Sequence, residues 1–258
     1  QKYLLLIKKM NMYDKLSNNL NKLINFKQID ILYLATASFA KFFEKDFDDI
    51  VIKNIKSLVK DKTLVVPTFS FDFCDKGVYS VKESSTFCGD ISSKFILDKD
   101  SVRLKYNPIH NVTIWGKLKN AFNKKYTSAF GENSFFEELN NYKVGALLID
   151  CSFDDGVPFV HCLEDKYCCT YRIPKTFYGK IIDKDGKVND EIITRMVKKK
   201  NVLVSATEIG KRFYNTHYVK QIKYEKSNFV YFLLKDFYKF FNPIFKKNPN
   251  IMEIKNET

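Results

Sequence analysis

Residues 144–164, VGALLIDCSFDDGVPFVHCLE, combine an apolar run, an acidic turn and a His-x-x-Glu pair. The run at 144–149 predicts a buried strand, because short apolar stretches bounded by turn residues are typical of such strands. The acidic turn follows, and then His161 and Glu164. Ligands of open α/β sheets bind outside the carboxyl ends of the strands, so this order predicts a ligand site around His161.

His161 and Glu164 have the residue types and the spacing that proton abstraction requires. Histidine gains or loses a proton near neutral pH. A carboxylate three residues further on shares its helix face, orients the ring and holds its positive charge. The same spacing also occurs in solvated surface pairs. The chain has three histidines in all, and we interpret this one as a catalytic candidate.

The sequence before this stretch alternates helical and strand patterns. Apolar residues at helical spacing predict helices at about 12–26 and 46–59. Apolar runs predict strands at about 30–35, 64–66 and 112–116. This alternation predicts an α/β fold with a mixed, partly parallel central sheet flanked by helices.

We expect residues 1–258 to form a single domain. Residues 72–107 are polar and are expected to be a loop-rich insertion. Residues 181–203 alternate charged and aliphatic residues, and Asp185-Gly186 within them predicts a hairpin turn. Ser227 predicts the start of a C-terminal helix at about 227–242, which Asn242-Pro243 would end, and the polar tail is expected to fray.

Composition restricts the class of protein. The chain has 258 residues, 45% of them hydrophobic, which is enough for a substantial core. Its six cysteines form no Cys-x-x-Cys pair, so we interpret them as reduced thiols of a cytoplasmic protein. We expect neither a signal peptide nor a membrane span, because the apolar runs are too short.

The net charge of +13 favours an anionic partner. A phosphorylated small molecule or coenzyme is one candidate, and nucleic acid is another. A basic nucleic-acid-binding module is therefore an alternative from a different class. Aromatic residues interleaved with lysines in the last third support it, namely Phe213, Tyr214, Tyr218 and Tyr224. No nucleic-acid motif accompanies them, so the main prediction is a small-molecule partner and no nucleic acid.

Five segments in order resemble the aminoglycoside 3-N-acetyltransferase family. They are a small-residue turn, a Pro-Thr-Phe-Ser segment, a segment that ends in Trp-Gly, a Phe-Gly-x-x-Ser segment and the His-x-x-Glu pair. Their positions are 36–39, 66–70, 107–116, 130–134 and 161–164. Each segment alone is weak, whereas five in this order are fairly specific.

The resemblance implies an acetyl-CoA-dependent N-acetyltransferase with a mixed α/β fold unlike that of the GNAT acetyltransferases. His161 would match the general base and Glu164 its carboxylate partner, with direct transfer from the thioester and no metal. The other expected contacts are Ser38, Phe39 and Ser134 with the coenzyme, and His110, Asn107 and Asp155 with the acceptor. The resemblance leaves a homodimer open.

The identity of the acceptor is predicted from two features, the departures of this sequence from the family pattern and the net charge of the chain. Asn107 and Asn111 stand where aminoglycoside-modifying members usually have His and Ser. Aminoglycosides are polycations, which a protein of charge +13 would repel. We therefore expect the amine of a dTDP- or UDP-linked deoxyamino sugar, used for cell-surface glycans. The alternative is aminoglycoside acetylation, for which local negative charge could come from Glu132, Asp154, Asp155 and Asp165.

Three other hypotheses stay open at this point. His161, Glu164 and His110 or Cys162 could bind a metal, although catalytic zinc sites usually show a recognisable ligand spacing that is missing here. Cys162 could act as a covalent nucleophile, but neighbouring residues on a helix point in different directions. The third hypothesis is a relative that kept the fold and lost its activity, but such a protein would not need to retain both His161 and Glu164.

Overall fold

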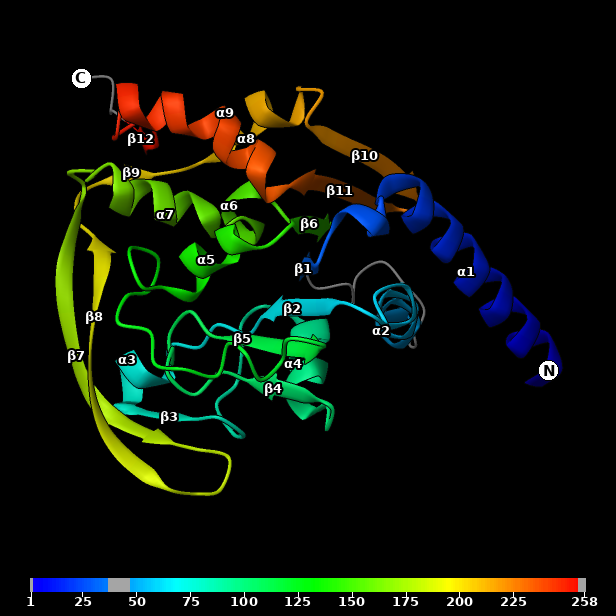
Figure 1. Ribbon diagram of the computed structural model, residues 1–258, viewed down its shortest axis with the longest axis horizontal. Coiled ribbons are helices and arrows are strands. Elements are labelled where there is room, and N and C mark those ends of the chain that lie inside the picture. The colour runs from blue at the N-terminus through cyan, green and yellow to red at the C-terminus, as the bar shows by residue number, and fades with distance from the viewer. Residues whose placement is uncertain (1, 37–46, 255–258) are drawn as a thin grey trace.

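A seven-stranded mixed sheet runs through the protein in the order β10-β11-β6-β1-β2-β5-β4 (Figure 1). The computed structural model describes residues 2–36 and 47–254. The strands of this sheet are β1 (Ile31–Thr36), β2 (Thr63–Pro67), β4 (Ser101–Arg103), β5 (Val112–Gly116), β6 (Val144–Ile149), β10 (Val219–Tyr224) and β11 (Ser227–Leu233). Strands β6, β1 and β2 are parallel, and the others pair antiparallel. The predicted mixed, partly parallel α/β fold is confirmed.

Helices cover both faces of this sheet. The central strands are apolar on both sides, so each face must pack against helices to leave water. Leu32 and Leu34 of β1 pack in one core, and Ile31, Tyr33 and Ala35 pack in the other. The first core is covered by α1 (Lys2–Leu23), α2 (Phe47–Leu58) and α4 (Asp90–Leu97). The second is covered by α5 (Phe135–Glu138), α6 (Phe153–Gly156), α7 (Phe159–Lys166), α8 (Thr207–Tyr214) and α9 (Leu234–Lys247).

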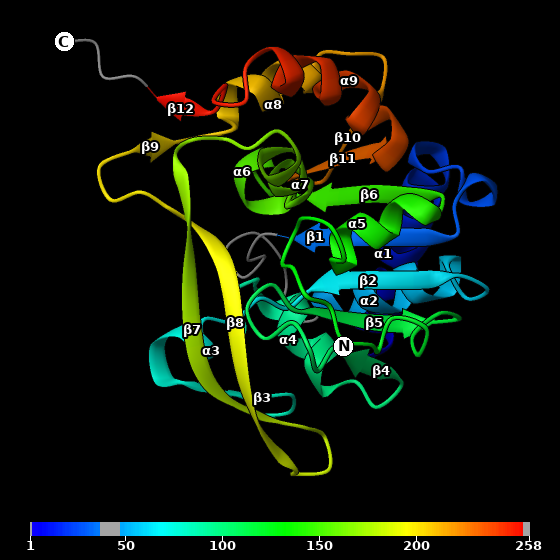
Figure 2. The same ribbon diagram turned by 60° about the vertical axis from the view of Figure 1, so that its left-hand side comes forward.

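A long hairpin crosses the end of the sheet toward which β6, β1 and β2 point (Figure 2). It consists of β7 (Arg172–Ile182) and β8 (Val188–Lys198), and β3 (Val78–Ser80) joins it in a three-stranded sheet. The turn at Asp185-Gly186 is confirmed, with Gly186 at φ 83°, a conformation that favours glycine. The remaining elements are η1 (Phe26–Gln28), α3 (Asp72–Lys76), η3 (Leu139–Asn141), β9 (Leu203–Val204) and β12 (Glu253–Ile254).

The helix expected at 227–242 is wrong in its first half. Residues 227–233 form β11, which lies between β6 and β10. Aromatic and β-branched residues favour a strand that is buried on both faces. Gly145 of β6 leaves room for Tyr231, since a Cβ at Gly145 would lie 2.7 Å from atoms of the Tyr231 ring. Phe229 and Tyr231 pack in one core, and the residues between and after them pack in the other.

Two further expectations about the C-terminus are wrong. Helix α9 continues through Pro243 to Lys247, because burial of Phe241 and Phe245 compensates for the hydrogen bond that proline cannot donate. The tail does not fray at once, since Met252 is buried and β12 pairs with β9. Segment 72–107 is also more ordered than expected, with two short helices and two short strands.

None of the helices among the described residues has the length and apolar character that crossing a membrane requires.

Candidate active site

The chain turns sharply where β6 ends. Thr36 and Ile149, the last residues of β1 and β6, are in register at this edge. Asp150 follows with φ 49°, and its carboxylate accepts hydrogen bonds from the Ser227 hydroxyl and, at 2.7 Å, from the backbone N–H of Asn228. This anchors the end of β6 to β11. Helices α6 and α7 come next, so His161 lies beyond the carboxyl end of β6.

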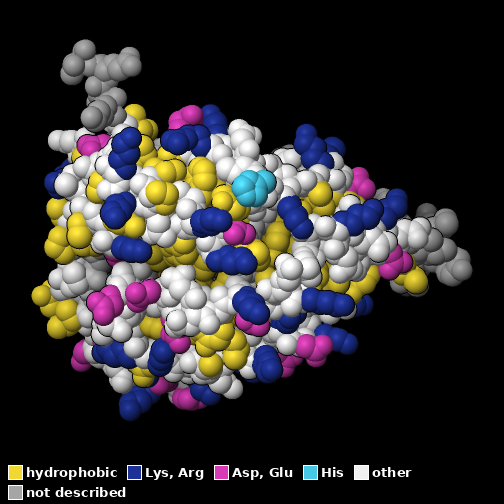
Figure 3. Space-filling model, turned by 45° about the horizontal axis from the view of Figure 1, so that its top comes forward, with side chains coloured by type: hydrophobic (Ala, Val, Ile, Leu, Met, Phe, Trp, Pro, Cys, Tyr) yellow, Lys and Arg dark blue, Asp and Glu magenta, His cyan; other side chains and the backbone are white. Residues whose placement is uncertain are grey.

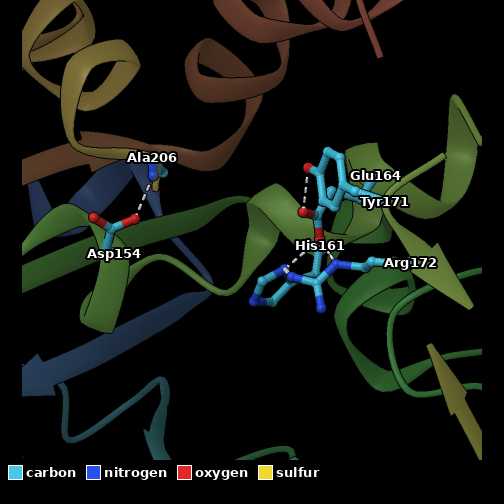
Figure 4. A network of polar contacts seen from close by, with 6 residues as sticks. All are labelled: Asp154, His161, Glu164, Tyr171, Arg172 and Ala206. Atoms are coloured by element: carbon cyan, nitrogen blue, oxygen red, sulfur yellow. Dashed lines mark hydrogen bonds and ion pairs between the residues drawn. The ribbon is translucent and has the colours of Figure 1, made fainter. Parts of the chain in front are cut away.

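His161 and Glu164 lie one turn apart on α7 and contact each other (Figure 4). The distance from Nδ1 of His161 to Oε2 of Glu164 is 2.6 Å. The Glu164 side chain is 0% exposed, whereas the His161 side chain is 30% exposed. One edge of the imidazole is therefore held from the interior, and the rest of the ring remains accessible.

Tyr171, which precedes β7, and Arg172, its first residue, complete the surroundings of Glu164. The Tyr171 hydroxyl donates a hydrogen bond of 2.5 Å to Oε1, and Nε of Arg172 forms an ion pair of 2.7 Å with Oε2. Burial by itself would raise the pKa of Glu164, but the hydrogen bond and charge of His161, the charge of Arg172 and the Tyr171 hydrogen bond lower the pKa overall. Glu164 is therefore ionised at neutral pH.

This charge state assigns the proton on the imidazole. Nδ1 of His161 is 2.6 Å from Glu164 and 3.3 Å from a guanidinium nitrogen of Arg172, and it cannot both donate to one and accept from the other. The shorter contact involves an ionised acceptor and is the stronger hydrogen bond. Nδ1 therefore carries the proton, and in the neutral ring Nε2 has the free lone pair.

Sequence reasoning missed Tyr171 and Arg172. Tyr171 follows Glu164 by seven residues, and the turn between them reverses the chain, so helical spacing does not connect them. A buried carboxylate requires a partner. That requirement is the signal that could have directed attention to the next arginine in the sequence.

Aromatic rings connect His161 to His110. The Phe130 ring lies between them, with centroid distances of 4.8 Å to His161 and 4.3 Å to His110. Burial lowers the pKa of His110, and the nearby charges of Arg195, His161 and Arg172 lower it further, so His110 is neutral. Asn107 is also buried, and its side-chain oxygen accepts the His110 backbone N–H at 3.3 Å. Of the three residues expected at the acceptor, the structure therefore places His110 one aromatic ring away from His161 and Asn107 beside His110.

The other expected contacts are placed differently. Ser38 and Phe39 lie outside the described residues. Ser134 is buried, and its hydroxyl caps α5 by accepting the backbone N–H of Glu137 at 3.0 Å. Asp155 is exposed and accepts a hydrogen bond of 2.7 Å from the Ser152 hydroxyl. Ser134 and Asp155 thus have local structural partners.

Asp154 anchors α8. Its carboxylate accepts the backbone N–H of Ala206 at 2.5 Å and the hydroxyls of Ser205 at 2.8 Å and Thr207 at 2.6 Å. Figure 4 shows this contact well separated from His161. The local negative charge that we considered for Asp154 is thus used at a helix N-terminus, where the helix dipole favours it.

We predict that Asp154→Ala lowers the free energy of unfolding by about 1–2 kcal/mol, the cost of a lost N-terminal cap. Urea unfolding followed by circular dichroism measures this. Asp155→Ala is the matched control and should change stability by about 0.5 kcal/mol or less. Equal effects of the two substitutions would show that Asp154 does not act as a cap.

Cys162 is unsuited to act as a nucleophile. It is buried beside Tyr238, and burial raises the pKa of its thiol to about 12. A nucleophilic cysteine reacts as the thiolate, which such a pKa nearly eliminates at neutral pH.

Two adjoining cavities lie along β8, the first of them beside Glu164, and we call them together the hairpin cleft. The first has a volume of about 440 Å³ and is lined by His110, Glu164 and Asp165 among others. The second has a volume of about 190 Å³ and includes Asn107. Both are lined by residues 127–129 of one loop and by Thr194 and Arg195 of β8. A third groove of about 730 Å³ lies between α5, α7 and α9, and it shares Phe130 and Asp165 with the first cavity.

The basic last third is part of the main fold. Phe213 and Tyr224, two of the four aromatic residues that suggested base stacking, are buried in the two cores. Figure 3 shows a face on which Lys and Arg side chains are spread with Asp and Glu among them. The segment therefore does not form a separate basic module.

Comparisons with known proteins agree with this geometry. The family model described as aminoglycoside 3-N-acetyltransferase matches residues 37–246. No curated protein matches the chain significantly by sequence.

Three solved structures illustrate the shared fold. The YokD protein from Bacillus subtilis is 17% identical, with a TM-score of 0.72 over 92% of this chain and 99% of that one. The enzyme AAC-IIIb with CoASH is 14% identical, with a TM-score of 0.76 over 91% of this chain and 96% of that one. AAC-VIa bound to sisomicin is 12% identical, with a TM-score of 0.76 over 91% and 97%. At such identities the likeness shows the fold alone.

The nucleotide-linked amino sugar expected as acceptor is wrong. The matching family model is one of aminoglycoside acetyltransferases, and nothing in the matches supports a nucleotide sugar. The error came from using the net charge of the whole chain. Salt screens exposed charges beyond about 8 Å, so the charges within a cleft decide what it binds.

Proposed function

Since the chain belongs to the aminoglycoside 3-N-acetyltransferase family, we propose that it transfers the acetyl group of acetyl-CoA to an amine of an aminoglycoside. The observation that carries this proposal is the contact between His161 and the buried, ionised Glu164 beyond the end of β6. Glu164 lies in the wall of the hairpin cleft, and so does Phe130, whose ring packs against His161.

His161 acts as the general base in this proposal. The amine attacks the thioester carbonyl carbon, a C–N bond forms and the C–S bond breaks. The proton of the amine passes to Nε2 of His161 and then to the departing thiolate. Glu164 accepts the Nδ1 proton, keeps the ring in this tautomer and stabilises the imidazolium that forms.

Arg172 and Tyr171 act on Glu164 as positioning residues. Their contacts of 2.7 Å and 2.5 Å occupy the two carboxylate oxygens, which would otherwise be free to rotate away from the imidazole. A base that is fixed before the substrate binds needs no reorganisation during the reaction.

We place the coenzyme at the edge where β1 and β6 end, and Ser38 and Phe39, which follow β1 in the sequence, remain its predicted contacts. Support comes from the parallel pairing of β1 with β6, since ligands collect at the carboxyl ends of such strands. The related AAC-IIIb structure contains CoASH. Ser134 would contribute indirectly, by fixing the start of α5.

The hairpin cleft is the proposed acceptor site. It includes His110, Asn107 and Asp165. Burial and the charge of Glu164 raise the pKa of Asp165, and a nearby ammonium group would keep its carboxylate ionised. The structure of AAC-VIa contains sisomicin, an acceptor of this class.

The test is the initial rate of free-thiol release from acetyl-CoA with kanamycin A or sisomicin, together with mass spectrometry of the antibiotic. We expect thiol release that depends on the antibiotic and a product that carries one acetyl group. Hydrolysis at the same rate without an antibiotic would contradict the proposal, and so would release of no thiol with either acceptor.

A further inference from the structure

The hairpin cleft has an uneven distribution of charge. Two of its carboxylates are already paired, Glu164 with Arg172 at 2.7 Å and Glu191 with Lys125 at 2.9 Å. Asp165 forms no ion pair within the described residues. Asp165 follows Glu164 directly on α7, and its carboxylate accepts a hydrogen bond from the Gly131 backbone. Burial and the charge of Glu164 raise the pKa of Asp165. A cationic group of a ligand offsets both effects, so this end of the cleft, near His161, favours positive charge.

Arg195 supplies a positive charge where the two cavities meet, since it lines both of them. Its guanidinium lies 5.6 Å from the centre of the Phe71 ring and beside Cys74. Within residues 2–36 and 47–254 it forms no ion pair, and its buried Nε atom has no hydrogen-bond acceptor. The Cys74 side chain is its hydrogen-bond partner, and no carboxylate balances its charge. A cation that is partly removed from water without a counter-charge is costly, unless a ligand supplies further acceptor atoms.

Two neighbours of Arg195 in the cleft also have buried polar atoms without hydrogen-bond partners. The buried Nδ2 atom of Asn107, a hydrogen-bond donor, has no partner in the described part of the chain. Nδ1 of His110 is likewise buried and without a partner there. Because His110 is neutral, it adds no charge, and Arg195 remains the dominant charge at this end.

A bound acceptor must match both ends. An ammonium group is favoured beside Asp165, which also places it near His161. At the other end, oxygen atoms with lone pairs satisfy Arg195 and Asn107, whereas an ammonium group has no lone pair and is repelled by the guanidinium.

We propose that Arg195 determines acceptor specificity, by admitting a sugar ring whose hydroxyl oxygens face β8 and by disfavouring a ring with an amino group there. This inference rests on the proposed function. The cleft thus orients the acceptor, with the reacting amine toward Asp165 and His161 and the oxygen-rich side toward Arg195.

The test compares kanamycin A with kanamycin B, which differ in a hydroxyl or an amino group at one ring carbon. We expect the wild-type protein to prefer kanamycin A by about tenfold in kcat/KM and in Kd measured by calorimetry, as expected for one ammonium group near one partly screened guanidinium. Arg195→Met should abolish the preference, mainly through KM, and Arg195→Glu should reverse it.

Two control variants separate specificity from folding. Arg195→Lys keeps the positive charge and should retain the preference for kanamycin A. Arg212→Met removes an exposed arginine of α8 and changes the net charge equally, and it should leave the ratio unchanged. The inference is overturned if Arg195→Met lowers both rates equally, or if the wild type binds the two compounds equally.

Calorimetry separates this inference from the proposed reaction. Binding with the expected preference but without thiol release would support the role of Arg195 and would overturn the proposed catalysis. A failure of both kanamycins to bind would overturn both. Thiol release with equal preference would leave the catalysis intact and reject the role of Arg195.

Discussion

Replacing His161 with Asn is expected to lower kcat by about 10²–10⁴-fold, the contribution that a well-placed general base makes. Asparagine has no group that can accept the amine proton at neutral pH, although it retains polarity and similar size. The side chain is 30% exposed, so stability should change by about 1 kcal/mol or less. The rate of thiol release measures the effect on kcat, and thermal denaturation measures the effect on stability.

The matched control is His217→Asn, which changes an exposed histidine just before β10. It should leave kcat and the melting temperature unchanged. Residual activity of the His161 variant should rise with pH, because only the unprotonated amine can then react. A His161 variant with nearly full kcat would remove the general base from the mechanism.

Replacing Glu164 with Gln is expected to reduce both activity and stability. The substitution removes the negative charge that Arg172 faces at 2.7 Å, and it leaves a partly buried guanidinium without its partner. Loss of one member of a buried pair costs about 3–5 kcal/mol. We expect kcat to fall about 10²-fold, because the amide does not stabilise the imidazolium. Glu208→Gln, at an exposed pair on α8, is the control and should have little effect.

The stability effect should depend on pH in a defined direction. The pKa of Glu164 is lowered in the folded protein, so the ionised carboxylate stabilises the fold above about 4.3, the ordinary pKa of Glu in an unfolded chain. This contribution is lost as the pH falls through the lower pKa of the folded state. The difference in melting temperature between wild type and Glu164→Gln should thus be constant near neutral pH and shrink in acid. A constant difference down to pH 2 would contradict the assigned charge.

The elements that the sequence predicted correctly are those that depend on residues close together in the chain. The strands at 30–35, 64–66 and 112–116 and the hairpin at Asp185-Gly186 were predicted from local periodicity and turn chemistry, and the structure contains them. The helix prediction for residues 227–233 was wrong because an aromatic run fits helical and strand spacing equally well. Its pairing with β6, about 80 residues earlier, decided between them.

The candidate site divides in the same way. The sequence by itself determined that His161 and Glu164 share one face of a helix after a buried strand, because three-residue spacing is a local property. Only the tertiary structure decided that Arg172 and Tyr171 hold Glu164, and that Asp154 caps a helix 52 residues away. It also placed Arg195 in the cleft. These contacts depend on where the chain crosses itself, since a buried charge selects its partner by distance in space and not by position in the sequence.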